Sequence, residues 1–222
     1  MHQPACILFD LDGTRVDTAR DFHAGVNRLR RLDQLPDIDF EVIRAVVSEG
    51  ARAVIAAGFP HLAPDSEAFE ARRTAFLDHY AAHHADHAMV FPGLAEVLDT
   101  LDARGLPWGV VTNKARRFTL PLMDALGLGT RAATIVCPDD VTHPKPHPEP
   151  MRLAATQAGV AAERCIYVGD HRRDIDAGRA AGMHTVAVGW GYVQAGDSPA
   201  DWQADTLCEQ VDDFARWLND RL

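Results

Sequence analysis

Five short apolar segments, separated by helical patterns, constrain the fold of this sequence most strongly. Each segment is almost continuously apolar rather than alternating, which is typical of parallel strands buried on both faces. The segments are 5–9 (ACILF), 107–112 (PWGVVT), 133–137 (ATIVC), 165–169 (CIYVG) and 184–188 (HTVAV). Helical patterns lie between them at 93–105, 116–129, 149–160 and 172–182. The alternation predicts an α/β fold, a doubly wound parallel sheet with helices on its faces.

One long interval interrupts this alternation. Residues 17–87 are helical in pattern throughout, without a convincing strand, and Pro36 and the run FPHLAPD (59–65) punctuate them. An all-helical block placed between the first and second strands predicts an inserted helical cap subdomain. The expected domains are therefore a catalytic core of residues 1–16 and 88–222 and a cap of residues 17–87.

Composition limits the possible partners. The 222 residues carry a formal net charge of −10, which argues against nucleic acid, because phosphate backbones require clustered Lys and Arg. No apolar run approaches the ~18 residues of a membrane span, and the first ten residues lack the basic region of a signal peptide. The four cysteines are widely spaced and are expected to be reduced core residues. We expect a cytoplasmic protein that does not bind membranes and that is a monomer or a homodimer.

Chemically active residues follow several predicted strands. Asp10 ends the first strand, Thr112 ends the second and Asp170 ends the fourth, with Asp174 one helical turn beyond Asp170. A further loop, VTHPKPHPEP (141–150), carries Lys145 between two prolines. Ligands of α/β sheets bind in the crevice at the carboxyl ends of the strands, so these side chains are expected to meet there.

Their charges predict a metal ion and a phosphate. Asp10, Asp12 and Asp170 would repel one another unless they shared a cation, and a cluster of oxygen ligands suits Mg²⁺. Lys145 and Thr112 can then supply donors to a phosphate group. An aspartate facing a phosphoryl group can attack it and form an aspartyl-phosphate. A second carboxylate two residues away can protonate the leaving oxygen and later activate water. This divides the attack and the proton transfer between Asp10 and Asp12.

These motifs resemble a known family. The segments DLDGT, VTN, KPHPEP and GDHRRD, in this order, are similar to the four motifs of the haloacid dehalogenase superfamily in its phosphatase branch. The similarity covers the whole chain, because such enzymes carry a helical cap after the first motif. It implies that Asp10 is the nucleophile and Asp12 the general acid and base. It also implies that Thr112 and Asn113 bind phosphoryl oxygens and that Lys145 neutralises them. It further implies that the Asp12 backbone carbonyl and Asp170 bind Mg²⁺, and that Asp174 supports Lys145 or a metal-bound water.

Within that branch, the segments at 48–59, 165–183 and 189–205 are similar to phosphoglycolate phosphatases and N-acetylmuramic acid 6-phosphate phosphatases. Two residues depart from the family pattern. The family usually has an apolar residue where Arg15 stands, and often a small or acidic residue where His171 stands. Both departures border the expected mouth of the site, so they bear on the identity of the substrate rather than on the chemistry.

Other residues have weaker signals. Arg52 follows Gly50 near an expected helix start in the cap, a position that suits anionic ligands, and is a candidate for substrate recognition. Arg15 could meet a substrate carboxylate at the cap hinge or form a surface ion pair. His79, His83, His84 and His87 include i, i+4 pairs that could bind a transition metal, but a solvated helix end is the default interpretation.

The sequence therefore predicts a Mg²⁺-dependent phosphatase acting on a small phosphorylated metabolite, either 2-phosphoglycolate or a sugar phosphate such as N-acetylmuramic acid 6-phosphate. Two alternatives stay open. One is a phosphosugar mutase, which returns the phosphoryl group to its substrate. The other is a non-catalytic phosphometabolite-binding protein on the same fold, since fold does not fix function.

Overall fold

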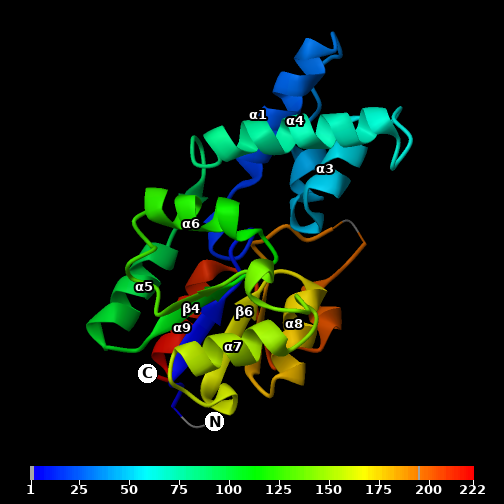
Figure 1. Cartoon of the computed structure of the whole chain (residues 1–222). Helices are drawn as coiled ribbons and strands as arrows, with labels where there is room; N and C mark the ends of the chain where they lie inside the picture. The colour runs from blue at the N-terminus through cyan, green and yellow to red at the C-terminus, as the bar shows by residue number, and fades with distance from the viewer. Residues whose placement is uncertain (1–2, 195) are drawn as a thin grey trace. The chain divides into compact units, whose positions relative to one another are not determined.

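The computed structural model describes residues 3–194 and 196–222, and the chain divides into two compact units (Figure 1). One unit combines the chain up to Val16 with Val90–Leu222, and the other is the continuous stretch Asp17–Met89. The chain passes between the units at two short strands that pair with each other, β2 (Val16–Asp17) and β3 (Met89–Val90).

The first unit is built on a six-stranded sheet with the order β5-β4-β1-β6-β7-β8, in which every neighbouring pair is parallel. The strands are β1 (Cys6–Phe9), β4 (Trp108–Val111), β5 (Thr134–Val136), β6 (Cys165–Gly169), β7 (His184–Val188) and β8 (Thr206–Cys208). The predicted doubly wound parallel sheet is confirmed. The edge strand β8 was not predicted, because its three residues carry little apolar signal.

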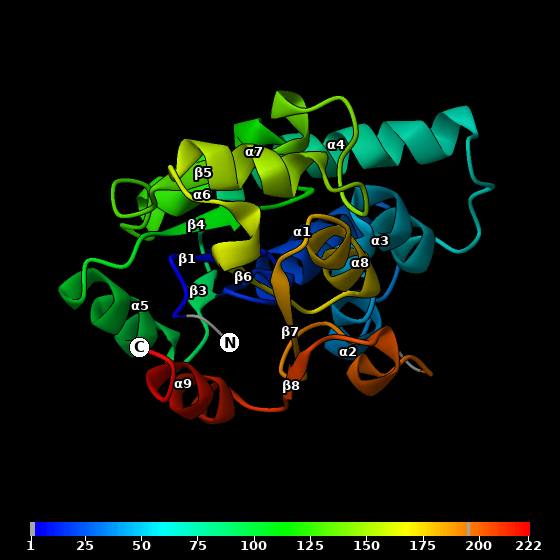
Figure 2. The same ribbon diagram turned by 90° about the horizontal axis from the view of Figure 1, so that it is seen from below.

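Helices cover both faces of this sheet. They are α5 (Leu94–Ala103), α6 (Arg116–Ala125), α7 (Glu149–Gln157), α8 (Arg172–Ala180) and α9 (Val211–Asn219). Helix α7 contacts β4 and β5, and α8 contacts β6 and β7. Helices α5 and α9 contact each other, and Figure 2 shows them on the side of the sheet away from α7 and α8. Single 3-10 turns lie at Pro138–Asp140, Ala162–Arg164 and Pro199–Trp202.

Strand β1 shows how the sheet builds two apolar layers. Successive side chains of a strand point to opposite faces. Cys6 and Leu8 join the cluster that includes Met151 of α7, whereas the Phe9 ring meets Phe214 of α9 edge to face at 6.0 Å. All four cysteines of the chain are buried, as predicted. Burial on both faces explains why this strand reads as a continuous apolar run.

The second unit is helical, with α1 (Ala19–Leu32), α2 (Phe40–Arg44), a 3-10 turn at Val47–Glu49, α3 (Ala51–Gly58) and α4 (Glu67–His83). Side-chain caps start two of these helices: Asp39 accepts from the Glu41 N–H, and Ser66 accepts from the Phe69 N–H. Buried rings of α1 and α4 form its core, and the ring centroids of Phe22 and Tyr80 lie 4.5 Å apart.

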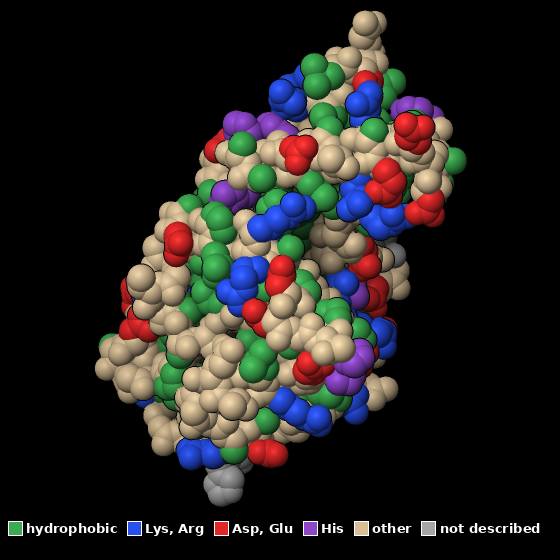
Figure 3. Space-filling view, viewed as in Figure 1, with side chains coloured by type: hydrophobic (Ala, Val, Ile, Leu, Met, Phe, Trp, Pro, Cys, Tyr) green, Lys and Arg blue, Asp and Glu red, His purple; other side chains and the backbone are tan. Residues whose placement is uncertain are grey.

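Among the described residues, no helix combines the length and apolar composition needed to cross a membrane. On the face seen in Figure 3, Lys and Arg side chains are interspersed with acidic ones in both units. The described part of the viewed face thus has no large cluster of Lys and Arg of the kind typical of nucleic-acid-binding surfaces.

Candidate functional site

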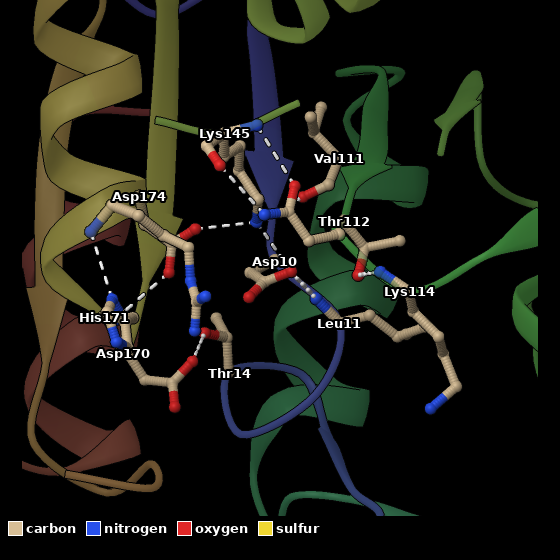
Figure 4. A network of polar contacts seen from close by, with 12 residues as sticks. Asp10, Leu11, Thr14, Val111, Thr112, Lys114, Lys145, Asp170, His171 and Asp174 are labelled. Atoms are coloured by element: carbon tan, nitrogen blue, oxygen red, sulfur yellow. Dashed lines mark hydrogen bonds and ion pairs between the residues drawn. The ribbon is translucent and has the colours of Figure 1, made fainter. Parts of the chain in front are cut away.

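Lys145, in the loop before α7, is the centre of a buried polar cluster (Figure 4). Its Nζ lies 2.9 Å from Asp10 Oδ1 and 2.7 Å from Asp174 Oδ1. The same ammonium donates to the Val111 carbonyl at 2.9 Å and to the Tyr167 hydroxyl at 3.0 Å. Both carboxylates and the ammonium are buried, so their mutual attraction is stronger than at a surface. Asp10, Lys145 and Asp174 therefore come together, as predicted.

The parallel sheet explains this convergence. Asp10 directly follows β1, Thr112 follows β4 and Asp170 follows β6, and these three strands are neighbours. Parallel strands end at the same edge, so residues far apart in the sequence meet there. Asp174 lies in the first turn of α8, and its Oδ2 accepts from the His171 N–H at 3.1 Å, which fixes the carboxylate toward Lys145.

The carboxylates influence one another's protonation. Burial raises the pKa of Asp170 to about 7, and repulsion from Asp10 and Asp174 adds to that rise. Burial likewise raises the pKa of Asp10, although Lys145 opposes the rise. For Lys145, burial alone would lower the pKa, but Asp10 and Asp174 outweigh it and hold the pKa above its usual value. The ammonium stays charged at neutral pH, while the raised pKa values of Asp10 and Asp170 report a burial and repulsion penalty on the ionised carboxylates that a bound cation would relieve.

A divalent cation fits this charge. Ligand oxygens of Asp10, Asp170 and Asp174 lie within 4.8 Å of one another. Asp10 and Asp174 both contact Lys145 through Oδ1, but the second oxygen of Asp174 also accepts from the His171 N–H, which leaves Asp10 and Asp170 as the carboxylates best placed for an ion. Two carboxylates with open positions for water and phosphate are the usual protein contribution to a Mg²⁺ site. Asp10 and Asp170 thus fit the predicted metal role, and the nature of the ion stays a prediction.

Asp170 is held by a small set of neighbours. Its Oδ1 accepts from the Thr14 hydroxyl at 2.7 Å, and its Oδ2 accepts from the Tyr192 N–H at 2.9 Å. The Trp190 indole N–H donates to the Thr14 carbonyl at 2.9 Å. A Cβ added to Gly191 would lie 2.2 Å from the Asp170 Cβ, so this position requires glycine. The loop after β7 therefore positions Asp170 through close backbone approach.

Asp12 has a partner that the sequence did not indicate. Lys114 Nζ lies 2.9 Å from Asp12 Oδ1, and the two side chains are only 6% and 15% exposed. Lys114 follows β4 by three residues, so it is delivered to the site by the same strand end as Thr112. The acid and base role of Asp12 stays a prediction, and the structure places a lysine where it can hold this carboxylate.

Thr112 and Asn113, which follow β4, contact different partners. Thr112 is buried, and its hydroxyl accepts from the Lys114 N–H at 3.1 Å. The Asn113 side chain donates to the Lys145 carbonyl at 2.9 Å and accepts from the Lys145 N–H at 3.1 Å. The Asn113 amide thus fixes the Lys145 loop, and the expected contact of Asn113 with a phosphoryl oxygen stays a prediction.

Arg15 does not occupy the place that the sequence suggested. We expected it at the mouth of the site or in a surface ion pair, but its side chain is fully buried against the Phe9 and Trp108 rings. A fully buried side chain packed on these two rings cannot reach a substrate at the surface of the site, so the predicted contact of Arg15 with substrate is wrong. The other departure, His171, caps α8 by accepting from the Arg173 N–H at 3.1 Å.

Arg52 belongs to the helical unit, where it is the second residue of α3. It forms ion pairs with Asp65 and with Glu70, the latter at 2.7 Å, and it is half exposed. Its role in recognition stays a prediction. Tyr167 and Thr14 are two further site residues that the sequence analysis missed. Tyr167 was hidden in an apolar strand, whereas Thr14 could have been found from its place directly after the DLDG turn.

Comparison with known proteins identifies relatives along nearly the whole chain. Residues 7–188 match the family model of the haloacid dehalogenase-like hydrolases. An N-acetylmuramic acid 6-phosphate phosphatase of Pseudomonas aeruginosa is 46% identical over 203 residues, which cover 91% of this chain and 89% of that protein. A phosphoglycolate phosphatase of Xanthomonas campestris pv. campestris is 44% identical over 210 residues, covering 95% of this chain and 94% of that protein.

A solved structure agrees at the level of the fold. A crystal structure described as a predicted phosphoglycolate phosphatase from Haemophilus somnus superimposes with a TM-score of 0.85 at 24% identity. The alignment covers 98% of this chain and 99% of that one. The family expected from the sequence motifs is confirmed by the family model and by the two phosphatases described above.

Proposed function

Because this chain belongs to the haloacid dehalogenase-like hydrolases, and is an enzyme of the phosphatase type among them, we propose that it hydrolyses a small phosphomonoester with the help of Mg²⁺. The observation that carries the proposal is the placement of Lys145 Nζ between Asp10, at 2.9 Å, and Asp174, at 2.7 Å. A buried ammonium beside a nucleophilic carboxylate is where the negative oxygens of a phosphoryl group would be stabilised.

The contacts of Asp10 suggest which oxygen attacks. Asp10 Oδ1 accepts from the Leu11 N–H at 2.7 Å and also contacts Lys145. These contacts fix the carboxylate, and Oδ2 is the oxygen that we assign to the attack on phosphorus. The new Oδ2–phosphorus bond forms as the ester oxygen–phosphorus bond breaks, which gives an aspartyl-phosphate. When bound at Asp10 and Asp170, Mg²⁺ would supply positive charge to the phosphate oxygens.

Asp12 completes the cycle. We propose that Asp12 donates a proton to the leaving alcohol oxygen in the first step. In the second step its carboxylate takes a proton from water, whose oxygen attacks phosphorus and frees Asp10 and inorganic phosphate. The Lys114 ammonium, whose Nζ lies 2.9 Å from Asp12 Oδ1, holds this carboxylate in place. We also propose that the helical unit, Asp17–Met89, acts as the cap that limits water access during the first step.

The names of two relatives narrow the class of substrate that we propose. Their names specify N-acetylmuramic acid 6-phosphate and phosphoglycolate. Both compounds carry a carboxylate besides the phosphate, and we propose that this chain also acts on a small phosphomonoester with a carboxylate. Arg52 is the candidate for this second anion, which would replace its ion pairs with Asp65 and Glu70.

A matched panel of esters tests the substrate. Release of phosphate is measured for N-acetylmuramic acid 6-phosphate against N-acetylglucosamine 6-phosphate, which lacks the lactyl carboxylate, and for 2-phosphoglycolate against ethyl phosphate. We expect a higher kcat/KM for the carboxylate-bearing member of each pair, and no turnover after Mg²⁺ is removed with a chelator. Equal rates within both pairs would refute the carboxylate requirement, and no release from any ester would refute the phosphatase itself.

The nucleophile is tested separately. Asp10→Asn should abolish turnover while the circular dichroism spectrum stays unchanged, because the amide is nearly isosteric but cannot form the acyl-phosphate. The exposed Asp124→Asn variant, on α6, serves as the control and should retain full activity. Wild-type kcat in Asp10→Asn would contradict the assignment.

A further inference from the structure

A second group of potential metal ligands lies on the outer side of the Lys145 loop. His143, His147 and Glu149 each offer one ligand atom, and these atoms all lie within 4.8 Å of one another. His143 Nδ1 is 3.1 Å from Glu149 Oε2, and His147 Nδ1 is 3.8 Å from the same oxygen. The two imidazole rings lie 4.7 Å apart. From the sequence alone, His143 and His147 are expected only to flank Lys145 and shape its loop.

The separations fit one metal ion. A tetrahedral ion with ligand bonds of 2.0–2.2 Å holds two ligand atoms about 3.3 Å apart. The separations of 3.1 and 3.8 Å lie on either side of this value. The His143 and His147 side chains are 62% and 50% exposed, so their rings are free to turn by the small amount that closes the site.

The carboxylate is already oriented. Glu149 is the first residue of α7, and its two oxygens accept from the Thr142 N–H at 2.9 Å and the His143 N–H at 3.0 Å. The Thr142 hydrogen bond is the main reason that the pKa of Glu149 lies below its usual value, so the carboxylate is ionised at neutral pH. Backbone bonds of this kind orient ligating carboxylates and improve metal affinity.

The loop itself is restrained. His143, Lys145 and His147 each precede a proline, and a following proline limits the backbone of the residue before it. The Asn113 amide holds the backbone of Lys145 from the other side. Lys145 is buried toward the catalytic carboxylates, whereas the two histidines are exposed, so the loop carries different chemistry on its two sides.

We propose that His143, His147 and Glu149 form a binding site for a divalent transition-metal ion, separate from the Mg²⁺ site. Two imidazoles and one carboxylate suit Zn²⁺ and its neighbours rather than Mg²⁺, which prefers oxygen ligands only. The ion replaces the proton that His143 Nδ1 shares with Glu149, and this proton passes to solvent. It also displaces the Glu149 N–H that donates to His147 Nδ1 at 3.2 Å. Water fills the remaining positions.

The bound ion would join both flanks of Lys145 to the start of α7. His143 lies two residues before Lys145 and His147 two residues after it, and Glu149 belongs to the helix. An ion held by all three would oppose local opening of the loop that carries the buried ammonium. The site is thus expected to stabilise the folded protein when the ion is bound.

The helical unit provides a matched control. His79 and His83 have the i, i+4 spacing that the sequence analysis considered, and their rings lie 4.3 Å apart. His83 Nδ1 pairs with Asp86 Oδ2 at 2.8 Å. Within residues 3–194 and 196–222, however, no third ligand brings this pair into a group of three. A histidine pair without the oriented carboxylate should bind more weakly.

Calorimetric titration with Zn²⁺ tests the proposal, on protein without a histidine tag and in saturating Mg²⁺ so that the catalytic carboxylates are occupied. We expect one Zn²⁺ per chain and a higher melting temperature with Zn²⁺. His143→Ala and His147→Ala should each weaken binding at least about tenfold, since even second-shell losses at metal sites cost 10–100-fold. Cobalt absorption should show nitrogen ligands in the wild type and lose them in both variants.

Two controls make the outcome decisive. His83→Ala should bind Zn²⁺ as tightly as the wild type, and Asp170→Asn should also retain the Zn²⁺ site, because its carboxylate belongs to the other cluster. Absence of Zn²⁺ binding by the wild type would overturn the proposal. So would unchanged affinity in both loop variants, or an equal loss in His83→Ala or Asp170→Asn.

Discussion

The guanidinium carbon of Arg15 lies 3.7 Å from the centroid of the Trp108 ring, in the apolar interior of the unit that contains the six-stranded sheet. The side chain is fully buried, and none of its three nitrogens has a hydrogen-bond partner among the described residues. Burial lowers the pKa of Arg15 to about 9, so the group still carries its charge at neutral pH. A desolvated cation–π contact stabilises by roughly 2 kcal/mol, whereas each unsatisfied buried donor costs about 1–3 kcal/mol.

Arg15→Leu should therefore stabilise the protein. We expect the free energy of unfolding in urea to rise by about 1–3 kcal/mol, on the order of the cost of one unsatisfied buried donor. The variant should retain the proposed phosphatase activity, because the Arg15 guanidinium packs on the Phe9 and Trp108 rings and makes no ion pair with Asp10, Asp12 or Asp170 within the described part of the chain. Trp108→Leu is the companion measurement. It should cost more stability in the wild type than in Arg15→Leu, since only the former also loses the cation–π contact. Lower stability of Arg15→Leu would show that the arginine is a net stabilising element.

Lys114 should affect the chemical step more than substrate binding. Its ammonium holds Asp12, the proposed acid and base, at 2.9 Å in a largely buried position. Lys114→Met should lower kcat about tenfold, which is less than the 10²–10⁴-fold typical for loss of a general acid and base itself, and should change KM little. Steady-state kinetics with a carboxylate-bearing ester measure both constants. Lys114→Arg, which keeps the charge, should recover part of kcat; no difference between the Met and Arg variants would rule out a role for the charge.

Gly191 should be essential for the metal site. An alanine Cβ there would lie 2.2 Å from the Asp170 Cβ and 2.6 Å from the Gly13 carbonyl oxygen. Gly191→Ala should therefore displace Asp170 and raise the Mg²⁺ concentration required for half-maximal activity at least about tenfold, in line with displaced ligand supports. The control is Gly129→Ala, whose Cβ would meet the flexible Asp124 side chain most closely. Equal Mg²⁺ dependence in the two variants would contradict the positioning role of the loop after β7.

His184 should make stability depend on pH. Its ring stacks on Trp217 at a centroid distance of 5.5 Å, and burial lowers its pKa below the usual value of 6.5. Between the lowered pKa and 6.5, the unfolded chain binds more protons than the folded one, so the free energy of unfolding increases with pH in this window. The wild type should lose stability as the pH falls below about 6.5 by up to roughly 1.4 kcal/mol per pH unit. Urea unfolding of His184→Gln across the same pH range should lack this contribution, and parallel curves for the two proteins would refute it.

The sequence by itself determined which segments form the buried strands and which chemically active residues follow each of them. Continuous apolar runs identified the buried strands, because a parallel strand covered on both faces has no polar side. Asp10, Thr112 and Asp170 could be placed at one edge, because parallel strands end together. The short edge strand β8 could not be found, since three residues carry too little apolar signal to separate them from a loop.

Only the tertiary structure decided the partners of individual side chains. Arg15 is next to Thr14 in sequence, but its side chain is buried in the apolar interior, where the rings of Phe9 and Trp108 accommodate it. Lys114 reaches Asp12 from another strand, and Glu149 meets His143 and His147 only because α7 begins at that point. Such contacts depend on distances between segments remote in the chain, whereas periodicity and spacing report only what is local.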